Sequence, residues 1–181
     1  MKRILFVLSA ALVITSCQNE PTEEIIAEDF DSVQFMIDLQ RLDSIMANGL
    51  PAKKDIKKAL VMYQDFANYF PNDPKAPNYL FQVSDFYYSL EQHEKAVSTL
   101  TTIIEKYPDY NRIESVYFTR ANHTDMDLRD TTLAKQYYEE FLEKYPNSQY
   151  ANDAKVRMEN VGLSIEDMVK KFDEMNAAAN K

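Results

Sequence analysis

Residues 76–108, APNYLFQVSDFYYSLEQHEKAVSTLTTIIEKYP, decide the fold. The first half of this stretch carries apolar residues at helical spacing: Leu80, Val83, Tyr87 and Leu90. A polar turn at residues 91–93 follows, and a second apolar helix runs from Glu94 until Pro108 stops it. The sequence therefore predicts two antiparallel helices that pack as a hairpin.

The ending of this hairpin occurs three times, as an aromatic residue followed by Pro and then Asn or Asp. The three copies are Phe70-Pro71-Asn72, Tyr107-Pro108-Asp109 and Tyr145-Pro146-Asn147. Their prolines are 37 and 38 residues apart, a period typical of helical repeats.

Counting back from each proline gives one shared register. The matching residues are Ala59, Ala96 and Ala134 twelve positions earlier, Tyr63, Leu100 and Tyr138 eight earlier, Phe66, Ile103 and Phe141 five earlier, and Ala67, Ile104 and Leu142 four earlier. These offsets define one face of a helix, with alanine where a neighbouring helix must approach closely.

Further helices are expected on both sides of the central hairpin. They span residues 31–47, 111–127, 133 to the third ending, 150–160, and 164 to 175. Asn111 and Glu114 have the spacing of a capping box, Gly162 can take a left-handed cap conformation, and Ser164 can cap the last helix. Only two glycines, with 45% hydrophobic and 12% aromatic residues, also favour packed helices.

Paired helices repeated in this way resemble tetratricopeptide repeats, and the resemblance covers about residues 50–160. The central unit matches that family at Leu80, Val83, Ser84, Tyr87, Ala96, Leu100, Ile103 and Pro108. Ile103 departs by its bulk, the first unit shows only its second helix clearly, and Asn122 and Asp125 replace small and aromatic residues. The repeats also exceed the usual length of about 34 residues. The resemblance implies an all-α solenoid of antiparallel helix pairs with a right-handed superhelix.

Longer repeats with this ending are similar to those of the lipoprotein of the β-barrel assembly machinery and of the cell-division coordinator of the Tol system. The residues do not decide between these two relatives. The tetratricopeptide resemblance implies a partner-binding groove built from the first helix of each pair. Its predicted residues are Asn78, Phe81, Gln82, Asp85, Tyr88, Ser89, Thr119, Arg120 and His123.

The first residues have the pattern of a secretory signal. Lys2 and Arg3 precede an apolar run of 11 residues, Ile4 to Ile14, which is about half the length that a membrane span needs. Ile14-Thr15-Ser16-Cys17 then resembles a bacterial lipobox, in which the cysteine is acylated and becomes the new N-terminus. Gln18 rather than Asp follows, which by the enteric sorting rule sends a lipoprotein to the outer membrane.

These features predict the organisation of the chain. The segments are a lipoprotein signal peptide (1–16), a flexible acidic tether (17–29), a helical repeat domain (30–176, with its repeat core at about 50–160) and a disordered tail (177–181). Loss of the signal would change the net charge from −9 to −11. Such a charge argues against nucleic acid as a partner, because nothing supplies a basic face for phosphates.

Catalytic motifs are missing from the sequence. It contains no phosphate loop, dinucleotide fingerprint, nucleophile elbow or His-x-x-x-His pair. His123, Asp125 and Asp127 could suggest a metal site, but residues two apart do not share a helix face, so a solvated helix end is the preferred interpretation. We therefore expect no enzyme, no catalytic residue, no cofactor and no metal.

The resulting hypothesis is a lipid-anchored scaffold or adaptor of the bacterial envelope, facing the periplasm, with other envelope proteins or peptides as partners. An alternative is a glycan- or nutrient-binding lipoprotein that uses exposed, adjacent aromatic residues such as Tyr79 and Tyr88 for stacking. Burial of these tyrosines between helices would favour the scaffold. The sequence leaves the oligomeric state and the identity of the partner open.

Overall fold

The computed structural model describes residues 30–49 and 51–179. The predicted signal peptide, the tether and Cys17 lie outside this part of the chain. Within the described ranges every regular element is helical, which confirms the predicted all-α, tetratricopeptide-like fold. The elements are α1 (Ser32–Ala47), α2 (Lys53–Tyr69), α3 (Ala76–Ser89), α4 (His93–Lys106), α5 (Ile113–His123), a π-helical turn η1 (Thr124–Leu128), α6 (Thr131–Lys144), α7 (Ala151–Asn160) and α8 (Ile165–Ala179).

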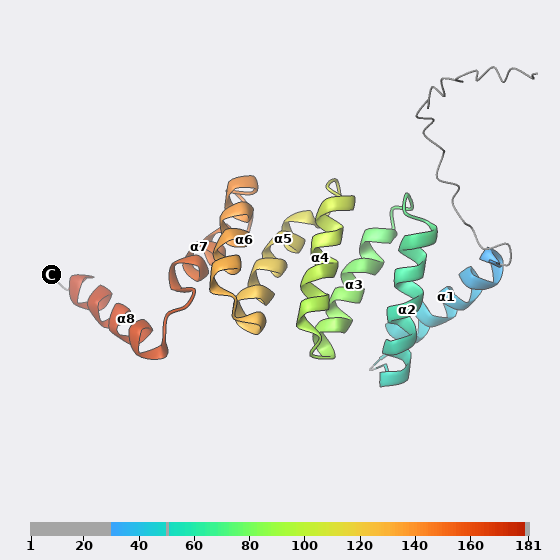
Figure 1. Ribbon diagram of the computed structural model, residues 1–181, viewed down its shortest axis with the longest axis horizontal. Coiled ribbons are helices and arrows are strands. Elements are labelled where there is room, and N and C mark those ends of the chain that lie inside the picture. The colour runs from blue at the N-terminus through green and yellow to red at the C-terminus, as the bar shows by residue number, and fades with distance from the viewer. Residues whose placement is uncertain (1–29, 50, 180–181) are drawn as a thin grey trace, which may run out of the picture.

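The helices form an elongated array of two rows. Each helix from α1 to α6 packs against the next one along the chain, and the contact between α3 and α4 is the most extensive. Figure 1 shows α2, α4 and α6 in the front row, with α1, α3, α5 and α7 behind them. The front row therefore holds the second helix of each pair, and the rear row holds the first.

The three aromatic endings have the same backbone geometry. Phe70, Tyr107 and Tyr145 have φ values of −126°, −131° and −130° and ψ values of 57°, 56° and 57°. Each of their N–H groups donates to the carbonyl four residues earlier, at 2.8 Å. The register counted from the prolines is confirmed as well, because Ala59, Ala96 and Ala134 all have 0% of their surface exposed.

The linkers after these endings repeat a second pattern, two successive backbone turns. In the first turn the N–H groups of Asp73, Tyr110 and Ser148 donate to the carbonyls of Phe70, Tyr107 and Tyr145. In the second turn the N–H groups of Ala76, Ile113 and Ala151 donate to the carbonyls of Asp73, Tyr110 and Ser148. These turns take up the residues by which the repeats exceed the usual length.

The same turns explain one wrong prediction, the capping box at Asn111. Helix α5 begins at Ile113, its N-cap is Arg112, and no side chain caps it. The second linker turn, from Ile113 to Tyr110, fixes where the helix starts, and Tyr110 is buried against the core. A side-chain cap at Asn111 has no place in that turn.

Other boundaries differ by a few residues. The predicted helix 111–127 is divided, because α5 ends at His123 and η1 follows it. Helix α6 begins at Thr131 rather than Leu133, and the carboxylate of Asp130 caps it by accepting from the Leu133 N–H at 3.0 Å. Helix α8 continues past Met175 to Ala179.

Two caps near the end of the chain agree with the sequence analysis. Gly162 has a φ of +82° after α7, as expected for a glycine that ends a helix. The Ser164 hydroxyl accepts from the Asp167 N–H at 3.1 Å and caps α8.

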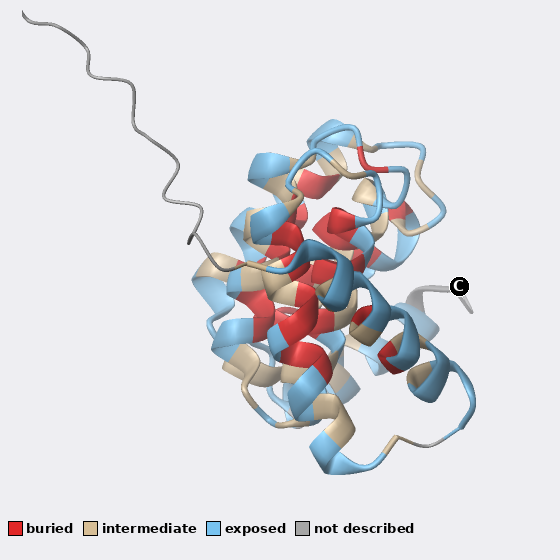
Figure 2. Cartoon of the chain, turned by 90° about the vertical axis from the view of Figure 1, so that its right-hand side faces the viewer, coloured by how far each residue is buried: buried red, intermediate tan, exposed pale blue. Residues whose placement is uncertain are grey.

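The core lies between the two rows and consists of two clusters. The first joins α1 to α4 and includes Tyr110 and Val116, whereas the second joins α5, α6 and α7. Figure 2 looks along the array and shows the buried residues in the middle of the helices, with exposed residues around them. This is the arrangement expected of a solenoid whose repeats contact only their neighbours.

Candidate partner-binding surface

The predicted groove positions on α3 are partly occupied by the chain itself. The Asn78 side-chain oxygen accepts from the Tyr110 hydroxyl at 2.8 Å. The guanidinium of Arg112 lies over the ring of Phe81, 4.3 Å from its centroid. Phe81 has only 7% of its surface exposed, so the linker before α5 covers this part of α3.

The remaining α3 positions lie nearer to solvent. Gln82 is half-buried, and Asp85, Tyr88 and Ser89 are exposed. Nearby protein atoms desolvate the Asp85 carboxylate and raise its pKa, although Arg112 acts in the opposite direction. The Ser89 hydroxyl donates to the Phe86 carbonyl at 2.8 Å, a local bond within the helix end.

Two predicted groove residues meet across the first helices of adjacent pairs. The rings of Tyr88 on α3 and His123 on α5 lie 4.3 Å apart between centroids, and His93 packs edge-on against Tyr88 at 5.4 Å. Both histidines of the chain thus contact one tyrosine. Burial lowers the pKa of His123, Asp127 acts against this shift, and His93 adds to it.

Arg120 contacts α6 instead of facing α3. Its guanidinium forms an ion pair with Glu140 and lies 3.8 Å from the ring centroid of Tyr137. Arg120 and His123 have 4% and 8% of their surface exposed, while Thr119 beside them is half-buried. Partner binding by the nine predicted residues stays a prediction, and the exposed members are the better candidates.

The structure contains a larger hollow surface that the sequence analysis did not identify. Three adjoining hollows of about 720, 370 and 690 Å³ all include Lys75. The first two also share Asp43 and Tyr79, and the last two share Asn78. We call these three adjoining hollows the Lys75 furrow, which extends from α1, past the start of α3, to the linker residues Tyr107–Asn111.

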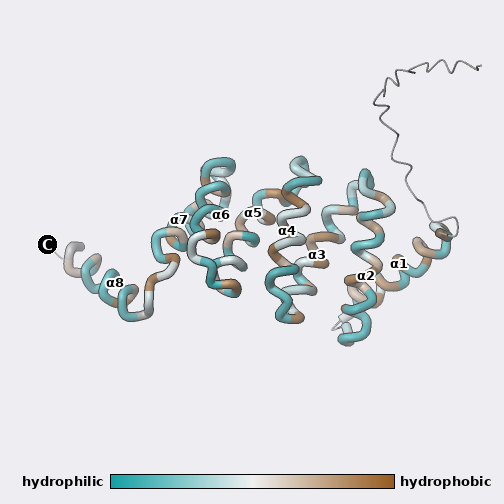
Figure 3. Tube along the Cα trace, viewed as in Figure 1, coloured by the Kyte–Doolittle hydropathy of each residue, from teal (hydrophilic) through white to brown (hydrophobic). Residues whose placement is uncertain are grey.

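Helix α1 forms the apolar wall of the Lys75 furrow. Val33, Met36 and Ile37 line it and are exposed, and Figure 3 shows hydrophobic residues along much of this helix. Their spacing was visible in the sequence as an apolar group at i, i+3 and i+4. This apolar group was not assigned to a surface, because the sequence shows only the second helix of the first repeat unit clearly.

Asp43 fixes the floor of the furrow by joining three helices. Its carboxylate on α1 accepts from the hydroxyls of Tyr63 on α2 at 2.8 Å and Tyr79 on α3 at 2.7 Å. Burial, and then the bond to Asp43, raises the pKa of both phenols. The centre of the furrow therefore joins α1, α2 and α3 through hydrogen bonds, with polar groups beside an apolar wall.

The tyrosines proposed for glycan stacking do not form a platform. Tyr79 is buried against the rings of Tyr63 and Phe66, at 4.5 and 4.8 Å, whereas Tyr88 contacts the two histidines. In the described ranges no group of three or more His, Cys, Asp or Glu could hold a metal ion. None of the helices in the described part is long and apolar enough to span a membrane.

Comparison with known proteins gives the class of the chain. Residues 1–18 match a prokaryotic membrane lipoprotein lipid attachment site, a segment that includes Cys17, the only cysteine. Residues 47–177 match the YfiO family, which is described as outer membrane lipoprotein.

Curated relatives agree with this match. The outer membrane protein assembly factor BamD of Xylella fastidiosa (strain Temecula1) is 26% identical over 168 residues, which cover 83% of this chain and 54% of that protein. BamD of Neisseria meningitidis serogroup B is 21% identical over 178 residues, covering 87% of this chain and 64% of the relative. The chain thus spans a little over half of the length of the relatives it matches. Since the family match extends over most of the described helices, the chain belongs to the YfiO family of outer membrane lipoproteins.

Proposed function

We propose that this outer membrane lipoprotein is an adaptor in outer-membrane protein assembly that binds segments of partner envelope proteins in the Lys75 furrow. The observation that carries the proposal is the position of the three hollows side by side around Lys75. It offers a peptide an apolar wall on α1, the polar groups of Asp43 and Lys75, and the aromatic and proline residues of the linkers. Peptides of partners commonly bind grooves with this mixture of apolar and polar groups.

The relatives support the same class of function. They are named outer membrane protein assembly factors, a name that denotes work with other proteins and no catalysed reaction. Glycan binding receives no support from these relatives. We propose that the chain acts by binding alone, on the periplasmic side of the outer membrane, with Cys17 as its acylated residue.

The experiment is site-specific photo-crosslinking in the native host, using the complete lipidated chain. A photo-reactive residue replaces Met36 in the wall of the furrow, and a matched one replaces Val156 on α7, which is also exposed but lies outside the furrow. We expect Met36 to capture one or two defined envelope proteins and Val156 to capture none of them.

Two results would contradict this assignment. Capture of the same proteins from both positions would mean that the furrow is not a specific site. Absence of protein adducts at Met36, while the chain is present in the outer membrane fraction, would remove the furrow as a partner surface. A Cys17→Ala variant tests the anchor separately, because this variant should be absent from the membrane fraction whatever the furrow binds.

A further inference from the structure

Helix α2 begins with a cluster of basic residues that neither the fold nor the furrow uses. The cluster is Lys53, Lys54, Lys57 and Lys58, four of the 20 basic residues of the chain within six positions. All four side chains are exposed. Among the described residues none of the four makes an ion pair or a side-chain hydrogen bond. The acidic residue between them, Asp55, instead accepts from the Ala52 N–H at 3.2 Å.

Three of these lysines share one helix face with an apolar residue. Lys54, Lys57, Lys58 and Val61 follow the i, i+3, i+4, i+7 pattern of a helix face. Val61 is 59% exposed. The opposite side of α2 is buried in the core through Ala59, Tyr63 and Phe66, so packing of the repeat holds the lysine face outward.

The charge of this surface contrasts with the rest of the molecule. The chain has a net charge of −9, yet the six residues from Lys53 to Lys58 carry four positive charges and one negative charge. A basic helix face with an exposed apolar residue complements a surface that presents dense negative charge at an apolar boundary. Anionic lipid headgroups have that chemistry, and the lipid attachment site keeps the chain beside them.

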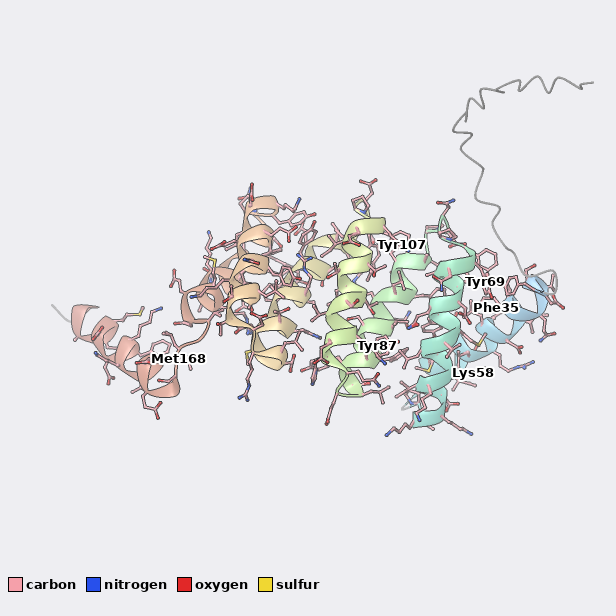
Figure 4. The ribbon with its side chains drawn as sticks, in the orientation of Figure 1. Phe35, Lys58, Tyr69, Tyr87, Tyr107 and Met168 are labelled. Atoms are coloured by element: carbon pink, nitrogen blue, oxygen red, sulfur yellow. The ribbon has the colours of Figure 1, made fainter. Side chains whose placement is uncertain are left out.

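The length of the tether allows this contact. Phe30, the first described residue, stacks on Tyr69 at the end of α2, with ring centroids 3.9 Å apart. Figure 4 shows Lys58 and Tyr69 toward opposite ends of this helix, which has 17 residues and is about 25 Å long. The 12 residues between Cys17 and Phe30 can extend to about 40 Å, so the lysines can reach the bilayer that holds Cys17.

We propose that Lys53, Lys54, Lys57 and Lys58 form a membrane-contact surface that binds anionic lipid headgroups and orients the solenoid on the outer membrane. The loop end of the Lys75 furrow, at Pro71–Lys75, lies at the other end of α2. Contact through the lysines therefore keeps that end of the furrow away from the bilayer, where it is accessible to partners.

The test uses Cys17, because the only thiol of the chain can be coupled to a maleimide lipid as a substitute for the natural anchor. The mature chain is coupled to vesicles of phosphatidylcholine alone or with phosphatidylglycerol. Lysine acetylation is then followed by mass spectrometry. Lys106, Lys135 and Lys155 are exposed lysines outside the cluster and serve as internal controls.

We expect acetylation of the four cluster lysines to fall about tenfold or more with phosphatidylglycerol, since each lysine contributes about fivefold to binding at an anionic surface. The control lysines should react equally on both vesicles. High salt should abolish the protection because it screens these charges. Equal reactivity of the cluster on both vesicles, or equal protection of cluster and control lysines, would overturn the proposal.

Variants give a second readout that does not depend on lysine chemistry. Without coupling to lipid, a Lys54→Glu/Lys57→Glu/Lys58→Glu chain should bind phosphatidylglycerol vesicles at least 100-fold more weakly than an uncoupled Lys106→Glu/Lys135→Glu/Lys155→Glu chain, which has the same net charge. The two variants should melt alike, because all six lysines are exposed. Equal binding by two folded variants would show that net charge alone acts, and would also overturn the proposal.

Discussion

At the scale of single residues, burial controls what the polar side chains of this molecule can do. His123 is the clearest case, since its ring lies against Tyr88 and its Nδ1 has no hydrogen-bond partner among the described residues. The titratable groups that act on it are Asp127 from η1 and His93 from the start of α4. Burial outweighs the attraction of Asp127, so the pKa of His123 is lowered.

This predicts a pH dependence of stability. The pKa of His123 is lowered in the folded state from an ordinary value of 6.5, so between the folded pKa and 6.5 the unfolded state binds more protons. The contribution of His123 to stability is therefore complete above about pH 6.5 and is lost as the pH falls below it. His123→Phe keeps a ring against Tyr88 but cannot titrate.

Urea unfolding at about pH 8 and about pH 5.5 tests this expectation. The wild-type chain should lose more stability than His123→Phe between the two values. Other carboxylates with shifted pKa values, such as Asp85 and Asp125, affect both proteins equally and cancel in the comparison. Parallel pH profiles for the two chains would show that His123 does not titrate in this range.

At the scale of the elements, periodic positions were predictable and linkers were not. Ala59, Ala96 and Ala134 were assigned to helix contacts from their distance to each proline, and all are buried. The start of α5 was wrong, because it depends on the backbone bonds of a linker that has no periodic pattern. The groove residues stay a prediction, but the sequence did not indicate that the linker residues Tyr110 and Arg112 contact Asn78 and Phe81 on α3.

Arg120 illustrates a second limit of periodicity. A register places a residue on a face, but it does not say which neighbouring side chain that residue will bind. Arg120 was assigned to the groove, yet its guanidinium is held between α5 and α6 by Glu140 and Tyr137. The ion pair depends on a specific Glu on α6, which no repeat pattern requires.

This pair leads to a prediction about the α5–α6 contact. Glu140→Ala should destabilise the chain by about 1–3 kcal/mol, because it leaves the buried guanidinium of Arg120 without its charged partner. Glu139→Ala is the matched control, since Glu139 is exposed on the same helix and should change stability by less than about 0.5 kcal/mol. Equal effects of the two substitutions in urea unfolding would mean that the ion pair adds nothing.

At the scale of the whole molecule, the two core clusters divide the array. The repeated endings predict a solenoid. They do not predict where its core divides into clusters, because all three repeats share the same register. The first cluster extends from α1 to Val116 on α5, the second joins α5 to α7, and Ile104 and Ile113 pack against both. Equivalent residues therefore stabilise different regions: Phe66 belongs to the first cluster and Phe141 to the second, five residues before their prolines.

This division predicts how the array opens. Phe141→Leu and Phe66→Leu make the same change at the same register position, and both rings are fully buried. Each substitution should lower the free energy of opening by about 1.4 kcal/mol, which corresponds to about tenfold faster amide exchange in the region that opens. In a solenoid each repeat is stabilised mainly by its neighbours, so the effect should stay near the substitution.

Hydrogen exchange measured by mass spectrometry distinguishes local from global opening. Phe141→Leu should accelerate amide exchange in α5, α6 and α7, while the amides of α2 and α3 keep their protection. Phe66→Leu should accelerate exchange in α2 and α3, while the amides of α5, α6 and α7 keep theirs. Equal acceleration along the chain in both variants would mean that the array unfolds as one unit. Local opening would instead allow the helices around the Lys75 furrow to stay folded while the distant end of the array rearranges, because α1 to α3 belong to the first cluster.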